Sequence, residues 1–243
     1  AERATRMSEL VDTTEMYLKV IYEMMEDGVA PLRARIVERL GHSGPTVSQT
    51  ISRMERDGLL SLEDDRKITL TEQGLREATE VIRKHRLAER LLTDVIGLPW
   101  DEAHDEACRW EHVMSEKVES LLLALLQMPD CDPYGNPIPR RVKNYKNFDP
   151  TVEGATLDSF WRRHPDGGAV QIGRIGEPVQ ACEGILKKLS EAKMLPGSKV
   201  TLRFDDGAET AALFLENTGK SGEKDLPVVT IPRDLFKHFF IKL

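Results

Sequence analysis

The sequence predicts a mostly α-helical protein with a small β-rich domain at its C-terminal end. Apolar residues recur at helical spacing between candidate capping residues, from Asp12 to about residue 126. A stretch rich in proline and glycine, residues 129–140, then ends the helical part. Beyond residue 168, short apolar runs bounded by turn residues indicate strands. At 243 residues, the chain is long enough to hold more than one domain.

The N-terminal region is expected to contain a helix-turn-helix followed by a wing. Capping residues, proline and glycine delimit three helices, at residues 12–28, 31–41 and 43–58. The turn between the second and third helices has the short spacing of a helix-turn-helix. Two short segments, 59–62 and 67–70, then predict a two-stranded wing with Arg66 at its tip.

The third of these helices has the features of a helix that reads DNA. One face is an apolar stripe suited to a core, formed by Val47, Ile51 and Met54. The opposite face carries hydroxyl, amide and guanidinium groups, on Thr46, Gln49, Thr50 and Arg53. A helix in a major groove needs such donors. An ordinary helical hairpin with an amphipathic helix remains the alternative that the pattern leaves open.

Charge distinguishes this region from the rest of the chain. The whole sequence has a formal net charge of -7, which argues against a general nucleic-acid coat. Residues 31–60 contain five arginines and three acidic residues, a local net charge of +2. A locally basic surface on an acidic protein is compatible with a DNA reader.

The segment D-E-A-H-D-E-A-C-R-W-E-H, residues 101–112, has the composition of a metal site. Four ligand-type residues follow one another at i, i+4, i+7 and i+8, which is one helix face: His104, Cys108, Glu111 and His112. Imidazole, thiolate and carboxylate together suit a transition metal. His85 and Glu89 repeat the i, i+4 relation within a long helix expected over residues 71–96. A polar helix surface without metal is the alternative interpretation of this spacing.

The remaining segments predict further elements and one possible interface. Residues 118–126 are rich in leucine, which fits either a dimer seam or an intramolecular core. Residues 141–167 are polar and weakly periodic, as in a linker. A helix is expected over 179–193, and strands are expected at 169–175, 199–204, 210–215 and 228–231.

Cysteine usage and hydropathy indicate a cytoplasmic protein. The three cysteines, at positions 108, 131 and 182, are few and odd in number, which argues against a disulfide framework. We interpret Cys131 and Cys182 as structural thiols. No apolar run approaches the ~18 residues that a membrane span requires, and no secretory signal precedes the first helix. We take Met7 as a natural start.

Six strings stand out in the first ~140 residues: L-V-D-T-T-E-M-Y-L from Leu10, P-L-R-A-R-I from Pro31, S-G-P-T-V-S-Q-T from Ser43, R-K-H-R-L-A-E-R-L-L from Arg83, H-D-E-A-C-R-W-E-H-V-M-S from His104, and Y-G-N-P-I-P from Tyr134. Together they closely resemble the diphtheria toxin repressor and iron-dependent regulator family. The resemblance implies a winged-helix DNA-binding domain (7–72), a helical metal-binding and dimerisation domain (73–140), a linker (141–167) and an SH3-like domain (168–243). Similarity fades after residue 140, although E-P-V-Q from Glu177 keeps the family's spacing of two ligands.

The resemblance also implies which residues act. The regulatory metal site would be formed by Met16, Cys108, Glu111 and His112. The ancillary site would be formed by His85, Glu89 and His104, with Glu177 and Gln180 from the SH3-like domain. The DNA-facing residues would be Thr13, Arg33, Ser43, Pro45, Thr46, Ser48, Gln49, Arg53, Arg56 and Arg66. His42 stands where relatives often have glutamine.

The softness of the implied ligands favours Fe²⁺ as the cofactor. The thioether of Met16 and the thiolate of Cys108 are poor ligands for hard ions and less suited to Mn²⁺ than carboxylates. The manganese-responsive relatives that this chain resembles have acids at these two positions. Co²⁺, Ni²⁺, Zn²⁺ and Mn²⁺ are expected as surrogates, with two metal sites per protomer.

The function that these observations predict is an iron(II)-dependent repressor of iron-uptake and iron-storage genes. We expect a homodimer that binds double-stranded operator DNA, without an organic substrate, a membrane partner or enzymatic activity. Metal binding would order the N-terminal helix and so permit operator binding. The alternatives are a manganese-responsive regulator of the same family, a di-metal helical oxidase, and a metal-independent winged-helix protein with a structural zinc. An oxidase usually uses Glu-x-x-His pairs, whereas Glu111 and His112 are adjacent.

Overall fold

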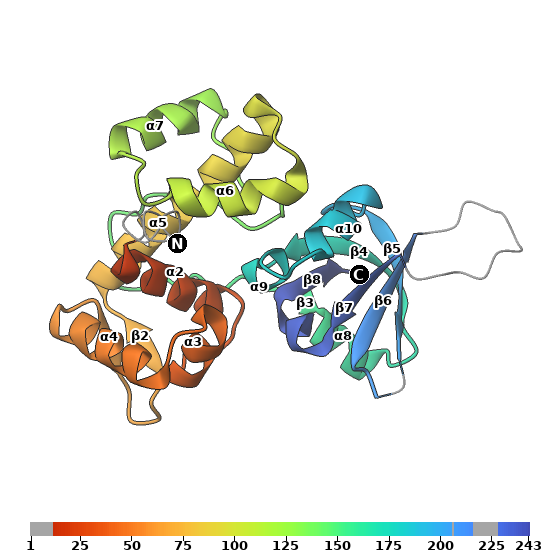
Figure 1. Ribbon diagram of the computed structural model, residues 1–243, viewed down its shortest axis with the longest axis horizontal. Helices are drawn as coiled ribbons and strands as arrows, with labels where there is room; N and C mark the ends of the chain where they lie inside the picture. The colour runs from red at the N-terminus through yellow and green to blue at the C-terminus, as the bar shows by residue number, and fades with distance from the viewer. Residues whose placement is uncertain (1–11, 206, 216–227) are drawn as a thin grey trace, which may run out of the picture.

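The computed structural model describes residues 12–205, 207–215 and 228–243. A helical part containing α2 to α7 lies beside a β-rich part built on one sheet, and α9 lies where the two parts meet (Figure 1). The helical N-terminal part and the β-rich C-terminal part confirm the fold class expected from the sequence. None of the helices in the described ranges has the length and hydropathy that crossing a bilayer would require.

The first part is a helix-turn-helix with a wing. Its elements are α2 (Thr13–Glu26), α3 (Arg33–Leu40), α4 (Gly44–Arg56), β1 (Leu60–Leu62) and β2 (Ile68–Leu70). The Asp12 carboxylate accepts hydrogen bonds from two backbone N–H groups of the first turn of α2, and the Ser43 hydroxyl caps α4 by accepting one from the backbone N–H of Thr46. The turn between the two antiparallel strands contains Arg66, whose φ is +66°. Buried apolar residues of α2, α3 and α4 pack with the wing strands into one core.

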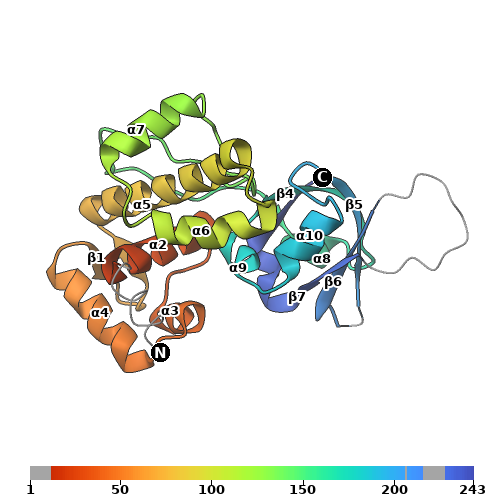
Figure 2. The same ribbon diagram turned by 45° about the horizontal axis from the view of Figure 1, so that its top comes forward.

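A long helix, α5 (Glu72–Leu91), is the central element of the helical part. It packs against α2, α6 (Ala103–Trp110) and α7 (Glu116–Leu125) (Figure 2). A π-helical turn (Leu92–Ile96) extends it, and a 3-10 turn (Trp100–Glu102) precedes α6. At its start, Gly74 is required, because an added Cβ would lie 1.9 Å from the carbonyl oxygen of Leu59.

The C-terminal part is an antiparallel sheet of six strands in the order β3-β8-β4-β5-β6-β7. The strands are β3 (Ala155–Thr156), β4 (Gly168–Ile175), β5 (Lys199–Phe204), β6 (Thr210–Leu215), β7 (Val229–Pro232) and β8 (Phe239–Lys242). The helices are α8 (Leu157–Arg163), α9 (Glu177–Gln180), α10 (Ile185–Glu191) and a 3-10 helix (Arg233–His238). Apolar residues of the strands, α8 and α10 form one core.

Three features differ from the sequence-based expectations. The helix expected over 179–193 is two helices, because Gly184 adopts a left-handed φ of +78° before α10. The segment expected as a linker contains β3 and α8, and Leu157 and Phe160 are buried in the core of the sheet. Helix α6 ends at Trp110, so Glu111 lies at its C-terminus and His112 lies in the following turn. The domain boundaries themselves remain a prediction.

Polar contacts hold the sheet against the helical part beside α9. The backbone N–H of Ile175 donates to the carbonyl oxygen of Tyr134, and the Asn136 side chain donates to that of Ile175. Arg174 lies between the end of α2 and the ring of Phe240, 3.5 Å from the ring centroid. These contacts place the first residue of α9, Glu177, next to α2 and α6.

Candidate metal centre and DNA-facing surface

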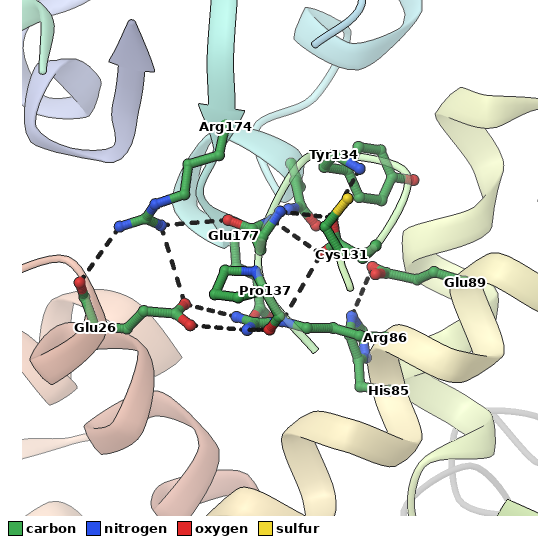
Figure 3. Close-up of polar contacts among 12 residues, drawn as sticks. Glu26, His85, Arg86, Glu89, Cys131, Tyr134, Pro137, Arg174 and Glu177 are labelled. Carbon is green, nitrogen blue, oxygen red and sulfur yellow. Dashed lines mark hydrogen bonds and ion pairs between the residues drawn. The ribbon is translucent and has the colours of Figure 1, made fainter. Parts of the chain in front are cut away.

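Ligand-type side chains from three segments meet in the interior beside α5. His85 and Glu89 come from α5, His104 and Cys108 from α6, and Glu111 from the end of α6. All except the half-buried Cys108 are at most 3% exposed. Figure 3 shows His85 and Glu89 side by side on α5.

His85 is held by carboxylates at both ring nitrogens. Its Nε2 lies 2.7 Å from Glu89 Oε1, and its Nδ1 lies 2.5 Å from Glu111 Oε2. His104 Nδ1 lies 3.3 Å from the same Glu89 oxygen, and His104 Nε2 lies 3.7 Å from Cys108 Sγ. Ligand atoms of His85, His104 and Cys108 all lie within 4.8 Å of one another, which is close enough for one metal ion to contact all three.

Lys19 of α2 extends into this cluster, a position that was not predicted from the sequence. Its Nζ lies 3.1 Å from Glu111 Oε2 and 3.1 Å from Glu177 Oε1. The same atom lies 3.3 Å from His85 Nδ1 and 3.7 Å from Cys108 Sγ. One signal could have found it: Lys19 follows Met16 by three residues, so both lie on the same face of α2.

The other predicted ligands lie around this cluster. His112 Nδ1 is 2.6 Å from Glu15 Oε2, and its Nε2 is 3.3 Å from Glu111 Oε1. Met16 is half-buried and packs against the N-terminal core. Gln180 is buried, and its amide group donates to the carbonyl oxygen of Ile175.

The two predicted ligand sets are contiguous in the structure. Cys108, assigned to the regulatory set, approaches His104 of the ancillary set. Glu111 of the regulatory set approaches His85 of the ancillary set. The structure thus brings together seven of the nine predicted ligands, His85, Glu89, His104, Cys108, Glu111, His112 and Glu177.

Charge in the centre is balanced between anionic donors and protonated bases. Burial raises the pKa of the Cys108 thiol, but the charges of Lys19 and His104 outweigh it and hold that pKa well below its ordinary value. Burial also acts to raise the pKa of Glu111, yet Lys19 and His85 lower it to about 2. Burial lowers the pKa of His85, but the neighbouring Glu89 and Glu111 carboxylates raise it well above its usual range.

These residues fit a transition-metal ion. The donor set combines imidazoles, a thiolate and carboxylates, as is typical of sites for Fe²⁺, Co²⁺, Ni²⁺ and Zn²⁺. Glu89 Oε2 is buried and has no hydrogen-bond partner among the described residues. An orphaned carboxylate oxygen at this position is costly unless a cation contacts it.

The residues expected to face DNA lie at the starts of α2 and α3, along α4 and its N-cap, and at the wing. Those exposed are Thr13, Ser43, Pro45, Thr46, Gln49, Arg53, Arg56 and Arg66, whereas Arg33 and Ser48 are half-buried. Arg53 Nη2 lies 3.5 Å from Thr14 Oγ1. Thr50, expected on the exposed face of this helix, is buried instead beside Tyr17. The Tyr17 hydroxyl also contacts His42 Nδ1 at 2.9 Å.

Two family models match the helical part of the chain. The model described as "Iron dependent repressor, N-terminal DNA binding domain" matches residues 9–68, and "Iron dependent repressor, metal binding and dimerisation domain" matches residues 71–140. The chain belongs to the iron-dependent repressor family. Its members are DNA-binding transcriptional repressors rather than enzymes, and this chain is therefore a repressor.

Curated relatives of the repressor extend the similarity over most of its length. It is 53% identical to the iron-dependent repressor IdeR of Mycobacterium tuberculosis over 203 residues, which cover 83% of this chain and 88% of the relative. It is 49% identical to the diphtheria toxin repressor of Corynebacterium diphtheriae over 218 residues, 89% of this chain and 94% of the relative. The resemblance inferred from sequence strings is thereby confirmed.

Solved structures resemble the repressor over nearly the whole chain. A manganese-dependent transcriptional repressor in complex with manganese is 26% identical, with a TM-score of 0.73 over 95% of this chain and 99% of that chain. The IdeR of T. acidophilum is 25% identical, with a TM-score of 0.66 over 96% of this chain and 98% of that chain. The C-terminal sheet is therefore part of an architecture shared with metal-dependent repressors.

Proposed function

We propose that this repressor is activated by Fe²⁺ and binds operator DNA as a homodimer, controlling genes for iron uptake and storage in the cytoplasm. One observation supports this most: the ligand cluster includes side chains from α6 and contacts α2, the helix that packs beside the DNA-reading elements. A bound divalent cation would supply an electrostatic link between these elements. This arrangement supports a coupling of metal sensing to DNA reading through the same N-terminal helix.

Residues of α2 form the connection between the two tasks. Glu15 contacts His112, and the next residue, Met16, is itself a proposed ligand. Three residues before Met16, Thr13 marks the exposed start of α2. When the ligands of α6 hold α2 in place, the N-terminal end of α2 is fixed relative to α4. Shifting such an equilibrium from 1:99 to 99:1 requires a difference of about 5.5 kcal/mol in the free energy of metal binding between the two states.

We propose two metal sites per protomer, as the resemblance implies. Met16, Cys108, Glu111 and His112 would form the regulatory site, and His85, Glu89, His104, Glu177 and Gln180 the ancillary site. The thiolate of Cys108 supports Fe²⁺ over Mn²⁺, with Co²⁺, Ni²⁺ or Zn²⁺ as surrogates. The three carboxylates, from Glu89, Glu111 and Glu177, keep a manganese-responsive regulator as the second candidate, and separate titrations with the two metals decide between them.

The surface of α7 supports the homodimer. Val118, Leu121 and Leu125 follow one another at helical spacing and are 46%, 62% and 59% exposed. Large apolar side chains that are contiguous and this exposed mark an interaction site. Two copies joined through α7 would present two copies of α4 to a two-fold symmetric operator.

Operator binding with and without Fe²⁺ tests this function. The probe is a duplex selected by the Fe²⁺-treated protein from a random-sequence pool, under anaerobic conditions. We expect binding with Fe²⁺, a loss of at least tenfold in affinity with chelator, and no metal response in Cys108→Ala or Glu111→Gln. Cys182→Ala, outside the cluster, is the matched control. Equal binding in chelator and in Fe²⁺ would refute the proposal.

A further inference from the structure

Lys19 places a positive charge among the residues proposed to bind metal. Its side chain is 5% exposed, and its ammonium group lies between the carboxylates of Glu111 and Glu177. Glu111 belongs to the proposed regulatory set, and Glu177 belongs to the proposed ancillary set. His85 and Cys108 lie within 3.7 Å of the same atom. Among the residues of α2 that form ion pairs, Lys19 alone contacts both ligand sets.

The contacts of Lys19 are made with the atoms that a metal would need. A cation bound to Glu111 and Glu177 would be held close to this ammonium group, and two positive charges in a buried site repel each other strongly. The ammonium group also neutralises the buried carboxylates, which would otherwise be destabilising. Lys19 and a metal ion therefore compete for the same donors.

From this geometry we infer that Lys19 is a resident counter-cation of the metal centre, which an incoming metal ion must displace. It stabilises the metal-free fold and lowers the affinity for metal, so that it sets the metal concentration at which the repressor is loaded. This inference rests on the proposed function, since it assumes that the cluster binds a metal ion.

The surroundings of Lys19 offer a second position for the displaced ammonium group. Glu23 lies one helical turn further along α2, at i+4, where side chains of the same face can meet. Its carboxylate lies 3.3 Å from Arg39 Nη2. Glu23 also lines a cavity of about 770 Å³ between α2, α3 and the C-terminal part. The four-carbon stem of Lys19 can thus turn from the ligands toward another carboxylate beside open space.

Removal of the charge tests the inference directly. Lys19→Met keeps the length of the side chain without its charge, Lys19→Arg keeps a charge, and Lys117→Met removes an exposed lysine of α7 as the matched control. Metal affinity is measured with Co²⁺ by absorption spectroscopy and with Fe²⁺ by anaerobic calorimetry. We expect at least tenfold tighter binding in Lys19→Met, a lower unfolding temperature of its metal-free form, and affinities within threefold of the unaltered protein in the other two.

A measurement on the unaltered protein covers the case in which Lys19→Met does not fold. Amine-reactive labelling followed by mass spectrometry reports the exposure of Lys19 with and without Co²⁺. We expect faster labelling of Lys19 after metal loading, because its ammonium group leaves the cluster. Unchanged or slower labelling, or unchanged or weaker metal binding in Lys19→Met, overturns the inference. Failure of the unaltered protein to bind either metal would refute the proposed function instead.

Discussion

At the scale of single residues, the ring orientation of His112 depends on Glu15. The carboxylate of Glu15 contacts Nδ1 at 2.6 Å, which directs Nε2 toward Glu111. A second carboxylate behind a ligand histidine commonly fixes the tautomer that presents the other nitrogen to metal. Glu15 is therefore expected to position His112 without binding metal itself.

This contact predicts the titration of His112. Burial lowers its pKa, but the hydrogen bond to Glu15 and the charge of Glu111 raise it above the ordinary 6.5. Because the folded pKa is raised, the pair stabilises the fold fully below pH 6.5, and this contribution is lost as the pH rises through the folded pKa. In Glu15→Gln, NMR titration of the metal-free protein should show a lower pKa for His112. An unchanged pKa, as expected for the control Glu72→Gln, would contradict this assignment.

Gln49 is the residue that we expect to recognise the base sequence of the operator. Its side chain is exposed on α4, where an amide can pair with the edge of adenine. Loss of a bidentate contact of this kind costs about 1–3 kcal/mol, so Gln49→Ala should bind its selected duplex roughly 5- to 150-fold more weakly. Binding to random DNA and metal affinity should not change. If fluorescence anisotropy gave the same preference for the selected duplex as in the control Gln73→Ala, Gln49 would not be a reading residue.

The ligand-type residues that share a helix face could be predicted from their spacing in the sequence. The residues that reach the cluster from other elements, Glu177 and Lys19, could not. His104 and Cys108 share one helix face because i, i+4 is a property of the helix itself. Glu177 reaches the cluster only through tertiary packing, so the residues alone gave no sign of it and the family resemblance was needed. Lys19 was missed because a lysine side chain is normally expected to extend its ammonium group into solvent.

At the scale of elements, the apolar face of α7 should carry the dimer contact. Replacing Leu121 by glutamate places a charge in the centre of that face, where burial of an unpaired carboxylate is unfavourable. We expect Leu121→Glu to sediment as a monomer and to lose most of its operator affinity, because two linked half-sites are no longer engaged. The exposed neighbour Lys117→Glu is the control. A Leu121→Glu protein with the mass of a dimer would place the interface elsewhere.

Helices whose signals are local were predicted, and elements that depend on distant pairing were not. Asp12, Ser43 and Gly41 mark the ends of α2, α4 and α3 through contacts within a few residues. By contrast, β3 consists of two residues that pair with β8, more than 80 residues away in sequence. No local pattern can indicate such a strand, which is why α8 and its neighbours were assigned to a linker.

At the scale of the whole molecule, one buried carboxylate joins the helical part to the sheet. Glu26, at the end of α2, accepts two hydrogen bonds from Arg86 of α5, at 2.8 and 2.6 Å (Figure 3). Arg174 of β4 lies 3.9 Å from the same carboxylate and 2.7 Å from Asp27. The end of the helix that carries Lys19 is thereby fixed to both parts of the molecule.

Loss of this carboxylate should weaken the fold. Breaking a buried ion pair by removal of one partner costs about 3–5 kcal/mol, since the remaining charge is left without its counter-charge. Glu26→Gln should therefore unfold at a lower denaturant concentration, whereas Glu38→Gln, on the exposed face of α3, should match the unaltered protein. Chemical denaturation followed by circular dichroism measures both. A free energy of unfolding equal to that of the control would show that Glu26 does not stabilise the contact.

The central claim is that metal binding and DNA binding are coupled through α2, and such coupling is reciprocal. If Fe²⁺ strengthens operator binding, operator DNA must strengthen Fe²⁺ binding by the same factor. Anaerobic calorimetry of Fe²⁺ binding, with the protein alone and with saturating selected duplex, is the most direct test. We predict at least tenfold tighter Fe²⁺ binding in the presence of the duplex. The same Fe²⁺ affinity with and without DNA would contradict the account.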